Sequence, residues 1–370
     1  MQASFKTYFR FFGILSVFQT FAFAALAAPT FGAEFNFTNF EVRHGQAQAS
    51  DVNSEVSESY RDAFMLEVMK VCGDCKVVTT ENSYGVKTYK IVYPDKWYFV
   101  IATDPAVIEV QTKPSTAKQI ENRLERIQKH IFDAAKAVGL DPASKVMGTE
   151  WAGSHIHVGA TSALGEGREA VLALRNFMVD FSNHPELATG VFTNDHSNAP
   201  PIAELPVMQR ELFKAVIADV DSGKIRSINT FANRVRKDVY SVTPSGWYPP
   251  TKYQAFNVNR IGNNQFALNE QTFEIRAMRG QDSAMDFLIE AKLLDARLEH
   301  LSKMKVPVAV SIPSREMSEE KKAESFYRFV IETGLDFAPY KRFLTSQQSA
   351  ALANIAKRVR TTPACKNILY

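Results

Sequence analysis

The sequence contains few cysteines, three among 370 residues, and this limits the covalent chemistry open to the chain. Cys72 and Cys75 form a C-x-x-C pair, and Cys365 lies near the other end of the sequence. A structural zinc site normally needs four ligands, which three cysteines cannot supply alone. A redox pair is expected in a strand-to-helix setting, which this stretch lacks. We therefore predict that Cys72 and Cys75 form a local disulfide, as in proteins of oxidising compartments.

The chain also lacks a strong excess of charge of either sign. Lysine and arginine number 43 against 40 aspartates and glutamates, so the formal net charge is +3. No basic stripe interleaved with aromatic residues is present, although such a stripe is typical of nucleic-acid-binding proteins. We therefore expect no nucleic-acid partner.

Long hydrophobic runs are absent except for one near the start, at residues 11–28. Lys6 and Arg10 precede it, and Ala25 and Ala27 form the small-x-small pattern that a signal peptidase recognises. These features predict a secretory signal peptide at residues 1–28 and an exported protein, periplasmic or extracellular. An uncleaved membrane anchor is the alternative, because the run is only slightly shorter than a spanning helix. No other membrane association is expected.

Internal repeats, low-complexity tracts and linkers are absent from residues 29–370, and we expect one domain there, with a second small domain as the alternative. Hydrophobic periodicity predicts strands at 30–37, within 77–93 and 97–112, and at 153–160, 253–259 and 271–278. It predicts helices at 54–71, 117–138, 168–181, 203–221, 283–304, 317–334 and 346–360. Because no regular βαβ order occurs, the pattern favours an α+β fold with an antiparallel or mixed sheet and helices packed on one side.

Four of the predicted strands carry two polar residues at i and i+2, which point to the same face of a strand. A solvated sheet face also produces such pairs, but lysine is absent from these positions. Carboxylate oxygens suit Mg²⁺ or Mn²⁺ and tolerate one imidazole ligand, and an adjacent arginine suits an anion. The pairs are Glu34 and Asn36, Glu109 and Gln111, His155 and His157, and Glu274 and Arg276.

Five segments that include these pairs resemble a known family. They are GAEFNF (32–37), VIEVQTKPST (107–116), GSHIHVGA (153–160), KYQAFNVN (252–259) and TFEIRAMRG (272–280). In the same order, they are similar to the G-x-E-x-E, E-h-x-(S/T)-x-P, G-x-H-h-H-V-G, K/R-Y-x-x-h-N and E-h-R-x-x-x-G segments of the amidoligases. These are carboxylate–amine ligases with a glutamine-synthetase-like fold. Each segment is short, so the resemblance rests on their shared order.

The resemblance implies a curved, mostly antiparallel sheet with helices on its convex face, holding Mg²⁺ (or Mn²⁺) and ATP. Such enzymes phosphorylate a small-molecule or peptide carboxylate, and an amine substrate then displaces the phosphate. Asn36 stands where the family has a second glutamate, which removes one negative charge. The implied metal ligands are Glu34, Asn36, Glu109, His157 and Glu274; the implied ATP-binding residues are His155, Asn257 and Arg276; and the implied catalytic residues are Arg276 and Arg279.

Two other functional classes remain open. ATP is scarce outside the cytoplasm, and an exported zinc-dependent hydrolase that uses His155 and His157 would not need it. A binding protein that has the same fold and no catalytic activity is the third interpretation. Metal identity would separate the hydrolase from the other two classes, and nucleotide turnover would separate the ligase from the binding protein.

Overall fold

The structure is a computed structural model of the chain. It describes residues 28–48, 55–82, 85–147, 155–184, 199–241, 250–304, 306–312 and 317–361. Residues 1–27 of the predicted signal peptide lie outside the described residues, as do residues 153 and 154 of one amidoligase-like segment.

The described strands form one nine-stranded sheet in the order β2-β3-β4-β5-β1-β7-β9-β8, with β6 also pairing with β1. Every pairing is antiparallel. The strands are β1 (Phe31–Thr38), β2 (Lys76–Glu81), β3 (Lys87–Val92), β4 (Tyr98–Asp104), β5 (Val107–Thr112), β6 (Asp141–Pro142), β7 (His155–Gly159), β8 (Phe256–Asn257) and β9 (Thr272–Ile275). Together with the helices, this sheet confirms the predicted α+β class.

The helices lie between and after the strands. They are α1 (Phe40–Gln48), α2 (Glu55–Val71), α3 (Ala117–Asn122), α4 (Leu124–Ile127), α5 (Ala134–Ala137), α6 (Ala143–Met147), α7 (Ala160–Leu164), α8 (Gly167–Asn183), α10 (Val207–Asp221), α11 (Ile228–Arg234), α12 (Ala284–Ser302), α13 (Glu319–Glu332) and α14 (Ser346–Thr361). Short 3-10 or π segments are η1 (Gln128–Asp133), η2 (Ile202–Glu204), η3 (Val235–Val239), η4 (Leu268–Glu270) and η5 (Ala338–Phe343).

Alternation in β1 separates an apolar face of the sheet from a polar one. Phe35 and Phe37 are buried, with at most 1% of either residue exposed. The Phe35 ring contacts the rings of Phe132 in η1 and Phe287 in α12 edge to face, at centroid distances of 5.0 Å and 5.5 Å. Phe37 packs in the same way on Phe64 of α2. Helices therefore cover the face of β1 opposite to Glu34 and Asn36, because side chains alternate along a strand.

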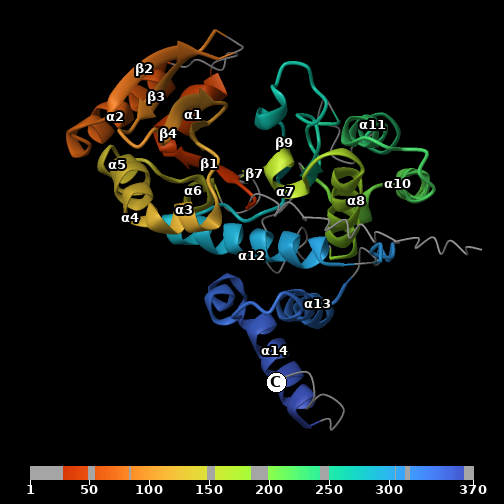
Figure 1. Ribbon diagram of the computed structural model, residues 1–370. Coiled ribbons are helices and arrows are strands. Elements are labelled where there is room, and N and C mark those ends of the chain that lie inside the picture. Colours follow the sequence, from red (N-terminus) through yellow and green to blue (C-terminus); the bar gives the residue numbers. More distant parts are fainter. Residues whose placement is uncertain are drawn as a thin grey trace, which may run out of the picture.

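Helix α12 crosses the molecule below the sheet, with α3 and α4 near one end and α8 near the other (Figure 1). Ser283 caps its first turn by accepting a hydrogen bond from the Asp286 amide, as is typical of a helix start. On its far side lie α13 and α14 (Figure 1). Arg297 of α12 joins these layers, since it donates to Asp180 of α8 at 2.7 Å and to Glu332 of α13 at 2.8 Å.

Most predicted elements are present, and the differences have local causes. The helix predicted at 117–138 is divided by a break near Arg123 and by the π-helical turn η1. The strand predicted at 253–259 contains only two strand residues, because the chain turns on both sides of Phe256 and Asn257. Helices α1, α7 and α11 were not predicted from the sequence.

The predicted disulfide between Cys72 and Cys75 is present and links the end of α2 to the start of β2. Its sulfur atoms are bonded to each other, so this pair is not available as a cation site in the oxidised protein. Closing even such a short loop stabilises the folded chain by about 2 kcal/mol in the chain-entropy account.

We expect the double variant Cys72→Ser/Cys75→Ser to unfold about 3 °C below the wild type, at about 0.7 kcal/mol per degree for a chain of this length. Differential scanning calorimetry would measure the midpoint, and reduced wild type should match the variant. Thr79→Ser, a conservative change on the exposed surface of β2, serves as the control and should leave the midpoint unchanged. Equal midpoints for wild type and double variant would contradict a stabilising role of this disulfide.

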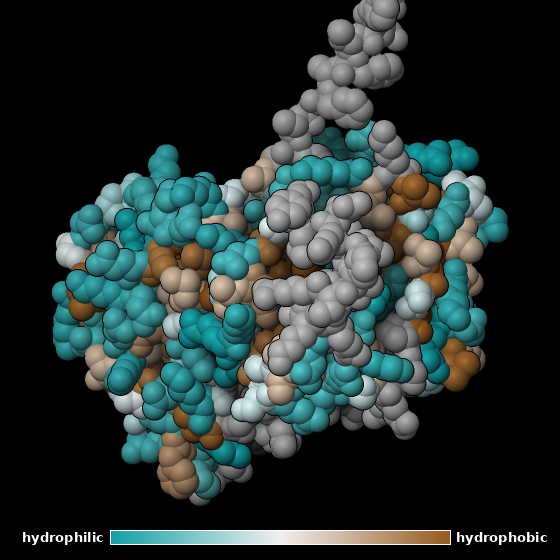
Figure 2. Space-filling model, turned by 90° about the horizontal axis from the view of Figure 1, so that it is seen from below, coloured by the Kyte–Doolittle hydropathy of each residue, from teal (hydrophilic) through white to brown (hydrophobic). Residues whose placement is uncertain are grey.

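No helix among the described residues is long and apolar enough to cross a membrane. On the face shown in Figure 2, hydrophobic side chains form small patches separated by hydrophilic ones. Such scattered hydrophobic residues are ordinary on protein surfaces.

Candidate metal and anion site

Register between neighbouring strands brings the predicted polar pairs onto one face of the sheet. Strand β1 lies between β5 and β7, and β9 lies between β7 and β8. The residues opposite each other are Glu34 and His155, His157 and Glu274, Asn257 and Glu274, Asn36 and Glu109, and Glu34 and Gln111. The sheet therefore unites all four predicted pairs, and Asn257 with them, in one cluster.

Glu34 lies at the centre of the cluster. Its Oε1 is 2.6 Å from His157 Nε2, and its Oε2 is 2.7 Å from His155 Nδ1. Only 8% of the residue is exposed. Burial by itself raises the pKa of this carboxyl, but the positive charge of His157 and the hydrogen bonds of both histidines lower it well below its usual value. Glu34 is therefore a buried carboxylate that stays ionised.

Glu274 is the second carboxylate of the cluster. Arg276 donates from Nη1 to its Oε1 at 2.7 Å, and Asn257 donates from Nδ2 to its Oε2 at 2.9 Å. His155 Nδ1 lies 3.2 Å from Oε1. Burial raises the pKa of the Glu274 carboxyl, but the charge of Arg276, followed by those of His155 and His157, lowers this pKa overall. Both oxygens of Glu274 are thus held in place by hydrogen-bond donors, one from β8 and one from the residue that follows β9.

Three of these side chains lie close enough together to hold one metal ion between them. One potential ligand atom each from Glu34, His157 and Glu274 lies within 4.8 Å of the others. The other ring nitrogen of His157, Nδ1, lies 3.2 Å from Thr272 Oγ1, which can orient the imidazole as metal-binding histidines usually are. Two carboxylates and an imidazole fit Mg²⁺ or Mn²⁺, and they also fit Zn²⁺. The residues present therefore fit a divalent cation.

Glu109 lies beside this group rather than within it. Gln111 Nε2 donates to its Oε1, and Asn36 lies opposite it on β1. Burial raises its pKa well above the usual value, and the negative charges of Glu34 and Asp104 raise it further. Burial and the neighbouring carboxylates therefore both favour a proton on Glu109, unlike Glu34 and Glu274, whose pKa values are lowered.

Two cationic side chains border the carboxylates. Arg276 lies with its guanidinium 5.7 Å from the centre of the Tyr253 ring, and its Nε makes no hydrogen bond with any described residue. Arg260 lies with Nη2 3.9 Å from Glu34 Oε1, and its side chain is 38% exposed. Such a border suits a ligand that carries negative charge.

Sequence reasoning missed two members of this neighbourhood. Arg260 follows the KYQAFNVN segment directly, but it lies outside the strands, so no periodic pattern marked it. Thr272 precedes Glu274 by two residues, and the same i and i+2 rule would have found it.

Arg279 does not join the cluster. Its guanidinium lies 3.6 Å from Asp282 and 5.9 Å from the centre of the Phe343 ring. Strand β9 ends at Ile275, so the alternation of faces does not continue to Arg279. The predicted catalytic pair of Arg276 and Arg279 is therefore divided, and only Arg276 contacts the carboxylates.

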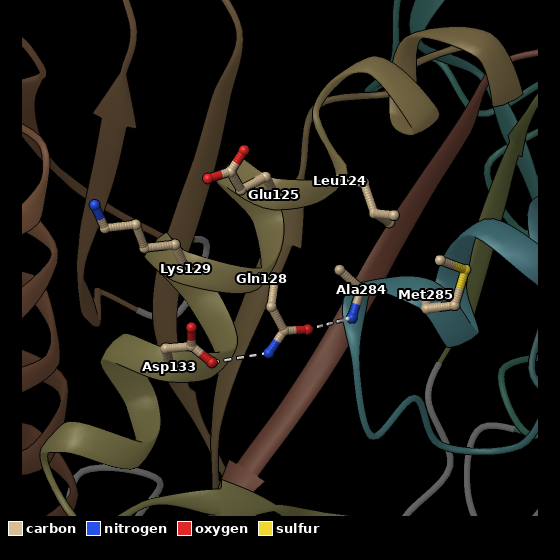
Figure 3. A pocket seen from close by; sticks show the side chains of 7 residues that line it. All are labelled: Leu124, Glu125, Gln128, Lys129, Asp133, Ala284 and Met285. Carbon is tan, nitrogen blue, oxygen red and sulfur yellow. Dashed lines mark hydrogen bonds between the residues drawn. The ribbon is translucent and has the colours of Figure 1, made fainter.

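A cavity of about 580 Å³ lies elsewhere, between α4, η1 and the start of α12 (Figure 3). The Gln128 side chain lines this cavity. It accepts a hydrogen bond from the Ala284 amide at 3.1 Å and donates one to Asp133 at 2.8 Å. These helices pack on the apolar face of the sheet through Phe132 and Phe287. The cavity is thus separated from the polar cluster by the sheet itself.

Comparison with protein-family models and with curated proteins finds no match for this chain.

Proposed function

We propose that the protein is an ATP- and Mg²⁺-dependent carboxylate–amine ligase of the amidoligase type, with a glutamine-synthetase-like sheet. It would form an amide bond through an acyl phosphate of a small-molecule or peptide carboxylate. The observation that carries this proposal is the contact of Glu34 and Glu274 with His155, His157 and Arg276 on one sheet face. A site for a metal and an anion could support several reactions. The five ordered segments that resemble those of the amidoligases favour amide ligation over the others.

Each cluster residue has a distinct task under this proposal. Glu34, His157 and Glu274 would hold the cation, with Glu109 and Asn36 at its edge. Bound Mg²⁺ and ATP would supply the phosphoryl group and part of the charge neutralisation that its transfer requires. Arg276 would add positive charge beside the transferred group, while Asn257 keeps Glu274 oriented. Arg260, which lies at the exposed side of Glu34, would attract the anionic substrate.

We also propose that the ligase is exported, on the basis of the hydrophobic run and the small-x-small pattern of Ala25 and Ala27. ATP would then have to reach the site from the cytoplasm, or the run would act as an anchor that leaves the domain inside.

A zinc-dependent hydrolase is the second candidate, and one observation favours it. The imidazoles of His155 and His157 both contact the carboxylate of Glu34. Two imidazoles and one carboxylate form a common catalytic zinc site, where the metal activates a water molecule. Arg276 beside Glu274 fits an anionic ligand better than a metal-bound hydroxide.

Thermal unfolding with Mg²⁺ alone, with Mg·ATP and with Zn²⁺ tests these proposals. A ligand at a hundred times its dissociation constant stabilises by about 2.7 kcal/mol, which is roughly 4 °C for a chain of this length. We expect this shift with Mg·ATP and expect Glu274→Ala to abolish it. The matched control is Glu81→Gln, which neutralises an exposed glutamate at the sheet edge and should keep the shift.

The other outcomes point elsewhere. A shift with Zn²⁺ alone would favour the hydrolase. No nucleotide-dependent shift would contradict the ligase and favour a binding protein. A Mg·ATP shift that survives Glu274→Ala would show that the nucleotide binds away from this cluster.

A further inference from the structure

The polar face of the sheet continues beyond the carboxylate cluster, across β5, β4, β3 and β2. Residues that are directly opposite each other on neighbouring strands share a face. The strand registers therefore define one row of side chains that leads from the cluster to β2, the strand at the edge of the sheet. From β1 to β2, this row consists of Glu34, Gln111, Val100, Lys90 and Val78.

A second row lies beside the first and carries two more lysines. Tyr98 comes two residues before Val100 on β4, so both side chains lie on this face. Lys76 of β2 lies in the same row as Tyr98, with β3 between them, and the Lys113 amide donates to the Tyr98 carbonyl at 2.9 Å. Lys90 Nζ lies 3.8 Å and Lys113 Nζ 5.7 Å from the centre of the Tyr98 ring. We call Lys76, Lys90, Tyr98 and Lys113 the lysine face.

The lysine face carries positive charge that the fold does not neutralise. None of its three lysines forms an ion pair with a residue that the structure describes. Lys113 Nζ donates instead to the Lys96 carbonyl, at 2.9 Å. Glu270 of η4 lies close enough for its charge to raise the pKa of Tyr98, after the larger effect of burial. One carboxylate does not balance three lysines, so the face favours an anionic ligand.

The lysine face is also accessible, because the helices cover the other side of these strands. Phe99 and Ile101 of β4 are fully buried on the helix side. On the lysine face, Lys90, Tyr98 and Lys113 are half-buried, and Lys76 is exposed. Val78, beside Lys90 on the edge strand, is 46% exposed. A ligand there meets ammonium groups together with the apolar surfaces of a tyrosine ring and a valine.

We propose that the lysine face binds the remote carboxylates of an acidic peptide whose reacting carboxylate lies at the Glu34 cluster. The proposal rests on the proposed ligase function, and it identifies the acid substrate as a peptide. Strands β1 and β3 are three strand spacings apart, which is about 14 Å at about 4.8 Å each. An extended chain spans roughly 3.3–3.6 Å per residue, so about four residues cover this distance. A single amino acid is too short to contact both places.

The test measures binding in Mg²⁺ without nucleotide and at low ionic strength, where exposed charges are least screened. Fluorescence anisotropy would compare labelled tetraglutamate with tetraglutamine, and competition would give the affinity of free glutamate. Tetraglutamate should bind about tenfold more tightly than either. Lys90→Gln/Lys113→Gln should weaken tetraglutamate binding about tenfold, because an exposed ion pair contributes up to about fivefold in affinity. The affinity for free glutamate should not change.

Two further variants control for net charge and for folding. Lys214→Gln/Lys224→Gln removes two exposed lysines from α10 and the turn after it, and it should keep the affinity for tetraglutamate. Helix α10 lies far from β2 and β3 in the molecule (Figure 1). Lys90→Arg/Lys113→Arg keeps both charges on the lysine face and should bind tetraglutamate within about threefold of the wild type.

Equal tetraglutamate affinity in the wild type and in Lys90→Gln/Lys113→Gln would overturn the proposal. An oligothymidylate that binds as tightly as tetraglutamate would also overturn it, because the face would then bind any polyanion. So would loss of the Mg·ATP stabilisation in this variant, because the nucleotide would then occupy the face. Lysine-dependent tetraglutamate binding in a protein that shows no Mg·ATP stabilisation would support the peptide site and reject the ligase.

Discussion

Glu34→Gln is expected to weaken binding of a divalent cation about a hundredfold or more. Glu34 contacts both histidines of β7, and it is the buried carboxylate whose low pKa keeps it charged. Substitution of residues that merely orient metal ligands already costs 10–100-fold in affinity. A glutamine at this position keeps the size of the side chain but removes a full negative charge from the proposed coordination sphere, so the loss should be at least as large.

Isothermal titration of the apo protein with Mn²⁺, in place of Mg²⁺, would measure this change. Asn36→Asp provides the opposite test, because it adds a carboxylate beside Glu109 where amidoligases carry a second glutamate. It should tighten Mn²⁺ binding, since cation affinity rises with ligand charge. Gln265→Glu, in the turn before η4, adds one exposed charge as a control and should have little effect. Unchanged affinity in Glu34→Gln would remove Glu34 from the metal site.

Glu290→Gln is expected to stabilise the protein at neutral and alkaline pH. Glu290 of α12 is fully buried, and Gln281 donates to one of its oxygens. Its other oxygen forms no hydrogen bond with the described residues. Burial raises the pKa of this carboxyl well above its usual value, and the hydrogen bond from Gln281 only partly offsets the effect. The folded state therefore favours the protonated, neutral form.

The sign of the pH dependence follows from this direction. Because the folded pKa lies above the unfolded value, the stability contributed by Glu290 is complete below about pH 4.3. It decreases by up to about 1.4 kcal/mol per pH unit as the pH rises toward the folded pKa. Glutamine does not titrate, so the variant should be more stable than the wild type near pH 7.5, by on the order of 1 kcal/mol, and should unfold about 1 °C or more higher.

Urea unfolding of wild type and variant across this pH range would measure the difference in unfolding free energy. The difference should be smallest near pH 4 and should grow as the pH rises. Glu121→Gln is the control of opposite sign: hydrogen bonds from Lys118 and Lys292 lower the pKa of Glu121 to about 2. The stability that Glu121 contributes is present above its unfolded pKa and is lost as the pH falls toward its folded pKa of about 2. A Glu290→Gln variant that is less stable at every pH would contradict the argument.

The local sequence alone determined which side chains of a strand lie together on one face. Phe35 and Phe37 alternate with Glu34 and Asn36, and alternation along an extended chain depends only on backbone geometry. The same reasoning predicted the two histidines of β7 on one face. The bounds of α2 and α12 followed from hydrophobic spacing, because a helix is stabilised by bonds and contacts only three or four residues apart.

Tertiary structure alone decided which of these faces meet. The order β5-β1-β7-β9 places Glu34 between two other strands, and the register puts His155 opposite it. Arg260, which lies in a turn, is close to Glu34, whereas Arg279, which lies beyond the end of β9, is close to Asp282 instead. The physical reason is that strand order and register depend on hydrogen bonds and packing between segments far apart in the chain, which local periodicity does not encode.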